Sequence, residues 1–128
     1  MKIEIPNDCG NAPKKEIIAE LNIAWAKADV IAITDFFHPE IEWEMVDEHN
    51  TIKGISQVTR FLENMKAAPA LALHLQTVIT HGKYAAARGT LQFNDQEVRF
   101  HDFYEFSSAG SKKITKITSM AKAFQKQK

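Results

Sequence analysis

The residues with the clearest chemical potential lie in one stretch, residues 96–106, which reads Gln-Glu-Val-Arg-Phe-His-Asp-Phe-Tyr-Glu-Phe. Its side chains alternate in character, as expected for an extended strand, because successive strand residues point to opposite sides of a sheet. One face is apolar and aromatic except for Asp102, and the other carries Arg99, His101 and Glu105. Burying an unpaired charge is costly, so a carboxylate among aromatic residues is a candidate functional group.

Asp102 has a functional and a structural interpretation. In an apolar pocket we expect its pKa to rise, because loss of solvation disfavours the charged carboxylate. A carboxyl group with a raised pKa can act as a general acid or base near neutral pH. The structural alternative is an Asp that hydrogen-bonds to a neighbouring strand or helix end. Tyr104 lies two residues farther along the same face, where its hydroxyl could orient a substrate oxygen.

Two further polar residues are candidates for assisting Asp102. Arg88 belongs to the preceding predicted strand, and we expect its face to point inward. There it would pair with Asp102 and lower the pKa of that carboxyl, or bind a carboxylate on a ligand. The alternatives are a surface arginine or a salt bridge at a dimer interface. His74 would be a catalytic partner in one strand register and an outer-face residue in the other, and the sequence leaves both open.

The residues that we expect to line a ligand pocket are large, apolar and spread over helices and strands. They are Trp25, Phe37, Trp43, Met45, Phe61, Phe100 and Met120. The alternative for each is an ordinary place in the hydrophobic core, because core and pocket use the same residue types. The five histidines do not share the one-face helical spacing of a zinc site, so we expect no metal. We also expect no cofactor.

The order of the predicted elements is helices first and strands afterwards. Apolar residues at three- and four-residue steps predict helices over residues 14–28, 30–37 and 55–66. Alternating residues predict strands over 41–46, 71–81, 83–93, 97–107 and 113–124, and residues 47–54 read as a polar loop. Residues 1–13 read as an irregular arm with a short strand over 2–5. This order predicts an α+β fold with the helices packed on one face of an antiparallel sheet.

Length and composition predict one domain, spanning residues 1–128. Sixteen basic residues balance sixteen acidic ones, so no overall field attracts nucleic acid or an anionic membrane, and we expect neither as a partner. No apolar stretch is long enough to cross a bilayer or reads as a signal peptide. Cys9 is the lone cysteine, which rules out an intrachain disulfide and fits the reducing cytoplasm.

The chain resembles the nuclear transport factor 2-like superfamily, and especially its SnoaL-like branch. The resemblance rests on two helices joined by a capping Asp29, on the segments at residues 36–46 and 52–62, and on Asp-Phe-Tyr-Glu-Phe followed by a turn and Lys-Ile-Thr-Lys-Ile. It implies a curved sheet wrapped around three helices, a cystatin-like cone with an interior apolar pocket, and a homodimer formed through the outer sheet face. Enzymes of this branch include polyketide cyclases, ketosteroid isomerases, dehydratases and epoxide hydrolases, and other members only bind ligands.

The residue-by-residue comparison with this superfamily points again to Asp102. The catalytic base of the ketosteroid isomerases falls on Met45, and their oxyanion-hole tyrosine falls on Leu21, and neither residue can do that work. Their second oxyanion-hole group falls on Asp102, and the resemblance implies an acid/base Asp on the same strand in SnoaL-type cyclases, which also supports Asp102. The epoxide hydrolases use an Asp-Arg-Asp arrangement, for which Arg88 is present but no second Asp is evident.

These observations predict a protein that binds a small, largely apolar molecule. The first hypothesis is a cofactor-independent isomerase, cyclase, dehydratase or hydrolase in which Asp102 transfers a proton. The second is a ligand-binding domain without catalysis, and the third is a protein-interaction module that uses the sheet face. We expect a cytoplasmic homodimer in each case.

Overall fold

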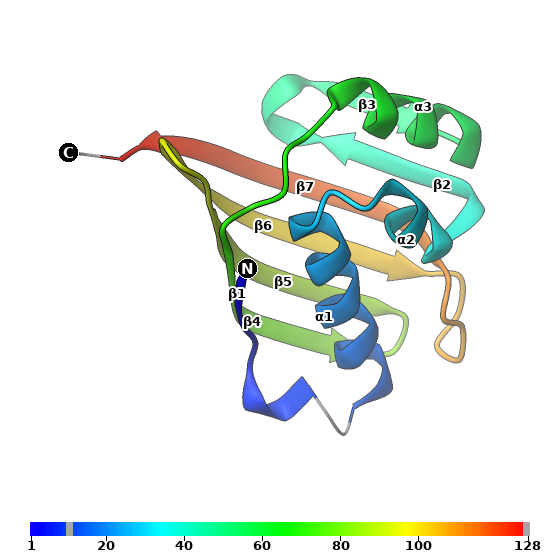
Figure 1. The fold of residues 1–128 in the computed structure, drawn as a ribbon. Helices are drawn as coiled ribbons and strands as arrows, with labels where there is room; N and C mark the ends of the chain where they lie inside the picture. Colours follow the sequence, from blue (N-terminus) through cyan, green and yellow to red (C-terminus); the bar gives the residue numbers. More distant parts are fainter. Residues whose placement is uncertain (10–11, 127–128) are drawn as a thin grey trace.

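Seven strands form one sheet in the computed structural model, which describes residues 1–9 and 12–126. Gly10 and Asn11, which belong to the predicted arm, and the terminal Lys128 lie outside the described residues. The strands are β1 (Lys2–Glu4), β2 (Phe37–Met45), β3 (Asn50–Lys53), β4 (Ala72–His81), β5 (Tyr84–Gln92), β6 (Gln96–Phe106) and β7 (Ile114–Gln125). Their order across the sheet is β1-β4-β5-β6-β7-β2-β3 (Figure 1).

The helices of the described residues lie together on one side of this sheet (Figure 1). They are α1 (Pro13–Ala26), α2 (Val30–Asp35) and α3 (Ile55–Met65), with short 3-10 turns η1 (Asn7–Cys9) and η2 (Val46–Glu48). Pro13 begins α1, because its fixed φ and missing N–H suit a first helical turn. The Asp29 carboxylate caps α2 by accepting a hydrogen bond from the Ala32 N–H at 3.1 Å. Gly54 precedes α3 with a φ of +88°, a conformation that favours glycine.

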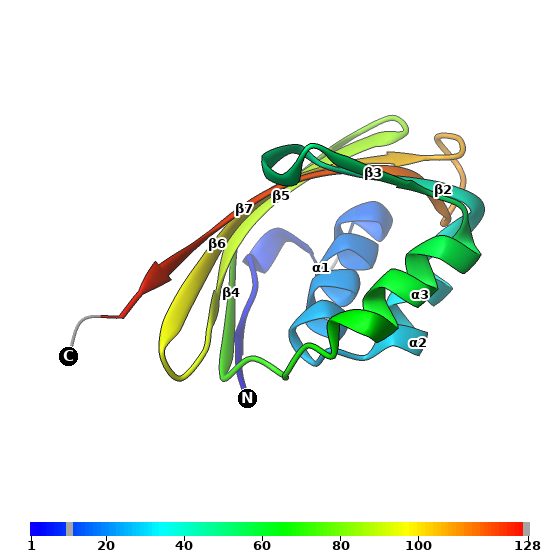
Figure 2. The same ribbon diagram turned by 90° about the horizontal axis from the view of Figure 1, so that it is seen from above.

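The sheet is strongly curved and open, and it wraps around the helices (Figure 2). Strands β4 to β7 form an antiparallel meander, whereas β2 pairs in parallel with β7 and β1 in parallel with β4. The register of β4 against β5 shifts between Leu75 and Thr77, so Gln76 is an extra residue in β4. Such a bulge bends a strand and changes which residues face inward after it.

The core lies between the helices and the inner face of the sheet. Its largest fully buried side chains are Ile18, Leu21, Ile41, Val58, Leu73, Leu75, Phe106 and Ile114. Three of the inward residues of β5 are small, namely Ala85, Ala87 and Gly89. A Cβ atom on Gly89 would lie 2.5 Å from the His74 carbonyl oxygen and 2.8 Å from Cζ of Phe100, so the glycine makes room for that ring.

The α+β fold class and the meander are confirmed, and two predicted boundaries are wrong. The second helix ends at Asp35 rather than at residue 37, and β2 begins at Phe37 and runs through Pro39. Pairing of β2 with β7 is irregular between Phe37 and Glu42, which lets a strand hold a proline. The predicted polar loop contains β3, whose polar residues hide the strand signal because only Ile52 is buried.

Candidate functional site

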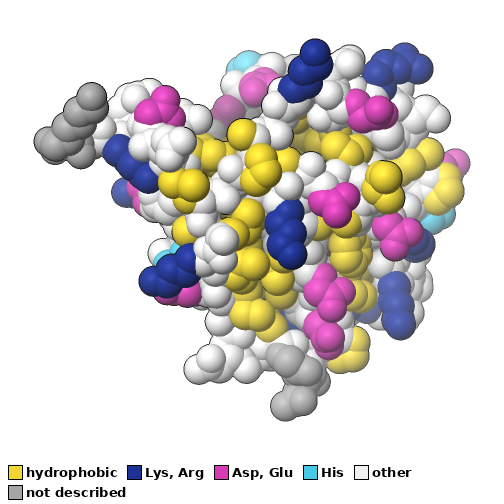
Figure 3. All heavy atoms as spheres, viewed as in Figure 1, with side chains coloured by type: hydrophobic (Ala, Val, Ile, Leu, Met, Phe, Trp, Pro, Cys, Tyr) yellow, Lys and Arg dark blue, Asp and Glu magenta, His cyan; other side chains and the backbone are white. Residues whose placement is uncertain are grey.

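A cavity of about 270 Å³ lies between the inner face of the sheet and helices α1 and α3. Five aromatic rings belong to its wall, those of Trp25, Trp43, Phe61, Phe100 and Tyr104. Trp43 stands edge-on to Trp25 and to Phe61, with ring centroids 5.3 and 5.5 Å apart. Hydrophobic side chains gather in the middle of the face that carries the helices (Figure 3). The cavity therefore suits an apolar molecule.

Asp102 reaches the cavity because β6 alternates as a regular strand. Phe100, Asp102 and Tyr104 lie on its inner face, whereas His101 and Phe103 are exposed on its outer face. Asp102 lies directly opposite Ser119 of β7, so both side chains enter the cavity at the same level. The antiparallel pairing of β6 and β7 thus places the carboxyl and the hydroxyl side by side.

A hydrogen-bond network surrounds the Asp102 carboxyl. The Tyr104 hydroxyl donates to Oδ2 of Asp102 at 3.2 Å, and the Ser119 hydroxyl forms a second hydrogen bond to this carboxyl. Asn22 of α1 donates from Nδ2 to the Tyr104 hydroxyl at 3.3 Å and to the Ile18 carbonyl oxygen at 2.9 Å. The Trp43 Nε1–H donates to Oγ of Ser119 at 3.0 Å. We call Asn22, Trp43, Asp102, Tyr104 and Ser119 the Asp102 network.

The surroundings of Asp102 change its proton affinity. Burial raises the pKa of Asp102 from 3.8 to about 7, and the hydrogen bonds from Ser119 and Tyr104 offset only part of that rise. The side chain keeps some solvent contact because it borders the cavity, but protein surrounds it on its other sides. Burial, and then the nearby Asp102 charge, raise the pKa of Tyr104 well above its ordinary value of 10. Near neutral pH the carboxyl therefore exchanges a proton while the phenol keeps its own.

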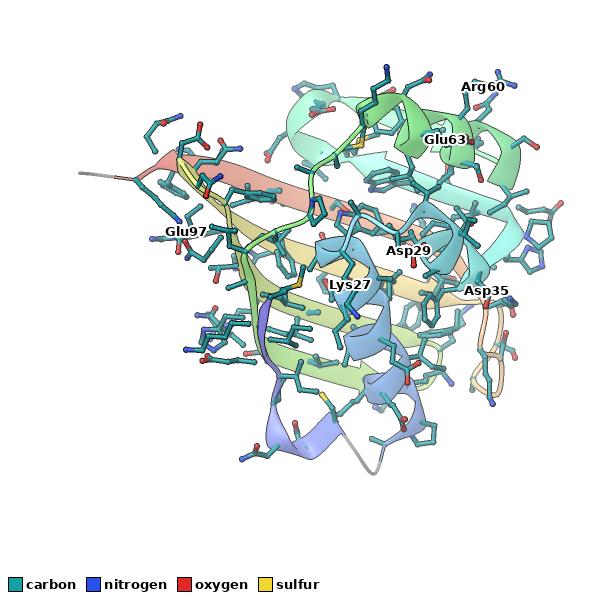
Figure 4. All side chains as sticks on the ribbon, in the orientation of Figure 1. Lys27, Asp29, Asp35, Arg60, Glu63 and Glu97 are labelled. Atoms are coloured by element: carbon teal, nitrogen blue, oxygen red, sulfur yellow. The ribbon has the colours of Figure 1, made fainter. Side chains whose placement is uncertain are left out.

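Other charged groups lie at the rim of the cavity or away from it. Asp47 and Glu48 of η2 are exposed and line the cavity, so it reaches the surface there. None of the charged residues labelled in Figure 4 lines the cavity, namely Lys27, Asp29, Asp35, Arg60, Glu63 and Glu97. Within residues 1–9 and 12–126, no three His, Cys, Asp or Glu side chains are grouped to hold a metal ion. No helix in the described chain is long and apolar enough to span a bilayer.

A comparison with known protein families identifies the family of this chain. A family model described as the SnoaL-like domain matches residues 18–117, which is more than half of the 128 residues. The chain belongs to the SnoaL-like domain family. A search of curated proteins finds no match for this SnoaL-like domain.

Solved structures share the fold of this SnoaL-like domain at low sequence identity. The epoxide hydrolase/cyclase-like enzyme SalBIII, which has a role in pyran ring formation in the polyether salinomycin, superimposes with a TM-score of 0.72 at 17% identity, covering 88% of this chain and 93% of its own. An NTF-2 like protein of unknown function from Burkholderia xenovorans LB400 gives 0.70 at 12% identity, covering 89% and 84%. A protein with a cystatin-like fold from Silicibacter pomeroyi DSS-3 gives 0.65 at 15% identity, covering 83% and 73%.

The structure brings most of the predicted site residues of the SnoaL-like domain together. Asp102 and Tyr104 line the cavity with five of the seven predicted pocket residues. These five are Trp25, Trp43, Met45, Phe61 and Phe100. Phe37 is buried in the core but does not line this cavity, and Met120 is exposed on the outer face, opposite His101.

The predicted inward orientation of Arg88 is wrong. Arg88 lies on the outer face of β5 and is exposed, and its Nε donates to Oγ1 of Thr77 at 3.0 Å. The neighbours that face inward are Ala87 and Gly89. Arg88 is therefore on the opposite side of the sheet from the Asp102 carboxyl and cannot pair with it.

His74 also lies outside the cavity, which settles the register that the sequence left open. Its side chain is about half exposed, and its Nε2 lies 3.8 Å from Oε2 of Glu4 in the neighbouring strand β1. The adjacent Leu73 and Leu75 point inward. His74 therefore belongs to the outer face, with Gln76 beside it, and has no contact with the Asp102 network.

Sequence reasoning missed Asn22 and Ser119. Asn22 is only 6% exposed and sits on the apolar face of α1, four residues after Ile18 and three before Trp25. A polar residue in the apolar stripe of a helix is the signal that could have identified it. Ser119 follows Ile117 on the inward face of β7, and the turn between β6 and β7 would have placed it opposite Asp102.

Proposed function

We propose that this SnoaL-like domain binds a small, largely apolar molecule in the cavity and moves a proton on it with Asp102, without a cofactor. The observation that carries the proposal is a carboxyl group with a pKa of about 7 on the wall of an aromatic cavity. A group with that pKa gives or takes a proton readily near neutral pH. Isomerisation, cyclisation, dehydration and epoxide opening all include such a step.

The other members of the Asp102 network have positioning roles in this proposal. Tyr104 and Ser119 hydrogen-bond to Asp102, so they hold its carboxyl toward the cavity and favour its ionised form. Asn22 holds the Tyr104 hydroxyl through a 3.3 Å hydrogen bond, and Trp43 holds Ser119. The name of SalBIII, an epoxide hydrolase/cyclase-like enzyme of this fold, supports acid/base chemistry at 17% identity only as an analogy.

The second candidate is a ligand-binding domain without catalysis. It is favoured by one observation, that the Asp102 carboxyl already has two protein hydrogen-bond donors, as a structural Asp would. In that case the network holds the cavity open and the bound molecule leaves unchanged.

Hydrogen exchange separates the two candidates. The protein would be incubated in D₂O with a panel of small apolar ketones and enones, and NMR would record deuterium uptake at carbon next to the carbonyl group. We expect at least one compound to exchange faster with the wild type and with Asp95→Asn, an exposed loop control, but not with Asp102→Asn. If apolar compounds bind but none exchanges in an Asp102-dependent way, the non-catalytic alternative is correct.

We also propose a homodimer through the outer face of the sheet. The support is a set of large apolar side chains that are exposed on that face, namely Ile79 at 60%, Phe103 at 65% and Met120 at 49%. Exposed apolar residues gathered in one patch mark a protein interface. The free thiol of the lone Cys9 is compatible with the reducing cytoplasm, where we expect the protein to act.

A further inference from the structure

The charged groups of the cavity are all of one sign. Its ionisable side chains, among the described lining residues, are Asp47, Glu48, Asp102 and Tyr104, and all of them are acidic. No Lys, Arg or His side chain lines it in the described part of the chain. A ligand carboxylate or phosphate would meet like charges here and would find no cationic partner, and a buried anion without a partner is strongly disfavoured.

The hydrogen-bond donors of the Asp102 network are already used within the protein. Asn22 donates from Nδ2 to Ile18 and to Tyr104, which in turn donates to Asp102. Trp43 donates to Ser119, whose hydroxyl is hydrogen-bonded to Asp102. A neutral indole N–H on Trp25 is the one side-chain donor of the cavity wall without an acceptor in the described residues.

Acceptors, in contrast, remain free. Oδ1 of Asn22 accepts no hydrogen bond from the described residues, although this side chain is only 6% exposed. No buried side-chain nitrogen or oxygen in the described chain lacks a partner, so this oxygen borders the cavity rather than packed protein. With the rim carboxylates of Asp47 and Glu48, the cavity presents a ligand with more free acceptors than free donors.

The rim carboxylates are placed to hold a cation. Asp47 and Glu48 are exposed, and neither forms an ion pair with a described basic residue. Oδ2 of Asp47 accepts a hydrogen bond from the Ala121 N–H at 3.2 Å, which fixes this carboxylate beside β7 at the rim. An ammonium group there would form charge-assisted hydrogen bonds with these carboxylates.

We infer that the cavity takes a lipophilic amine, with its apolar body against the aromatic wall and its ammonium group beside Asp47 and Glu48, and that it rejects carboxylates of the same shape. This inference deepens the proposed function and rests on it in one respect, that the cavity is where the ligand binds. It names the substrate class: a compact apolar molecule with one protonated nitrogen.

Three probes with one common body test the inference, namely 4-phenylbutylamine, 4-phenylbutan-1-ol and 4-phenylbutanoate. Binding would be followed by the fluorescence of Trp25 and Trp43, which line the cavity, in the full chain at neutral pH. We expect the amine to bind at least about tenfold more tightly than the carboxylate, with the alcohol between them, and the ratio to shrink as the salt concentration rises toward about 0.5 M.

Matched variants locate the source of the preference. In the Asp47→Asn, Glu48→Gln double variant we expect the amine and carboxylate affinities to agree within about threefold, since both changes keep shape and remove charge at exposed positions. The control is the Glu20→Gln, Glu40→Gln double variant, which removes two exposed carboxylates that do not line the cavity and should keep the wild-type ratio.

The outcomes separate this inference from the proposed function. A carboxylate that binds as tightly as the amine, or a ratio that survives in the rim variant, overturns the amine assignment and leaves proton transfer by Asp102 intact. Retention of the amine preference in Asp102→Asn, together with no Asp102-dependent exchange on any bound compound, overturns the catalytic proposal alone. Absence of binding by all three probes at about 1 mM overturns the amine assignment as well.

Discussion

The two faces of β6 carry adjacent residues in opposite environments. Asp102 points inward, where burial raises its pKa to about 7 beside the hydroxyls of Tyr104 and Ser119. His101, one residue earlier, points outward and is exposed next to Arg88, its direct partner on β5. One strand thus presents a desolvated acid to a cavity and a solvated base to the surface.

This contrast shows that side-chain type alone does not locate a site. Arginine and histidine are common catalytic groups, yet Arg88, His74 and His101 all lie exposed on the outer face, away from the cavity. The inner face offers a carboxyl, a phenol and a hydroxyl, and burial raises the pKa of the carboxyl to about 7. Substitutions on the inner face should therefore change stability and proton affinity far more than substitutions on the outer face.

The largest expected effect is on the pH dependence of stability in Asp102→Asn. The folded-state pKa of Asp102, about 7, exceeds its unfolded value of 3.8, so the wild type loses stability as the pH rises from about 4 to about 7. The neutral Asn avoids this loss. We expect the variant to exceed the wild type in free energy of unfolding by up to about 4 kcal/mol near pH 8, at 1.36 kcal/mol per pKa unit, and to match it near pH 4.

Urea unfolding at about pH 4 and pH 8 measures this difference. Asp95→Asn, in the exposed turn between β5 and β6, is the control and should stay within about 0.5 kcal/mol of the wild type at both pH values. A variant that is equally destabilised at both pH values would show that Asp102 is a structural group in the charged form.

A second contrast concerns neighbours on β5, Gly89 inside and Arg88 outside. A methyl group on Gly89 would come within 2.5 Å of the His74 carbonyl oxygen and 2.8 Å of the Phe100 ring. We expect Gly89→Ala to lower the free energy of unfolding by about 1–3 kcal/mol, because the backbone at His74 or the Phe100 ring must shift to make room for the methyl group. Arg88→Ala should lower it by about 0.5 kcal/mol or less, since it removes one exposed hydrogen bond to Thr77. Equal effects in thermal or urea unfolding would contradict this assignment of faces.

The same two strands show what the sequence can and cannot reveal. Residues 96–106 alternate so regularly that both faces of β6, and the inward position of Asp102, follow from the sequence. On β5 the inward residues Ala85, Ala87 and Gly89 are small, and the Phe100 ring fills the space above Gly89. At this part of the strand the larger residues, Tyr84 and Arg88, face outward, which is why the predicted orientation of Arg88 is wrong.

The other features that the sequence did not predict depend on contacts between residues far apart in the chain. The bulge at Gln76 of β4 contains no glycine or proline that would indicate it in the sequence. The faces of His74 and Thr77 therefore depend on the pairing of β4 with β5. Strand β3 escaped detection because its neighbours in β2, rather than its own apolar residues, hold it in the sheet. The link from Asn22 on α1 to Tyr104 on β6 spans 82 positions and depends on the packing of the helix over the sheet.

A third and smaller effect is expected inside the Asp102 network. Tyr104→Phe removes the hydroxyl that donates to Asp102 at 3.2 Å and accepts from Asn22 at 3.3 Å. Since that hydrogen bond lowers the pKa of Asp102, we expect its removal to raise this pKa further and to cost about 0.5–1.5 kcal/mol of stability. Carboxyl-carbon NMR of the variant measures the titration. Ser119→Ala should shift the Asp102 pKa in the same direction, and a downward shift in either variant would contradict the network.

The smallest effect on protomer stability is expected on the outer face, at Phe103, although the effect on assembly should be large. The side chain of Phe103 is 65% exposed in the single chain, so Phe103→Ser should change the free energy of unfolding of the protomer by about 0.5 kcal/mol or less. If the outer face pairs two copies, this variant should sediment as a monomer at concentrations where the wild type is a dimer.

The matched control is Ile31→Ser on α2, which removes an 83% exposed side chain from the helix side and should leave the dimer intact. A wild type that sediments as a monomer at high concentration, or a dimer that Ile31→Ser dissociates, would show that the apolar residues of the outer face do not pair two copies.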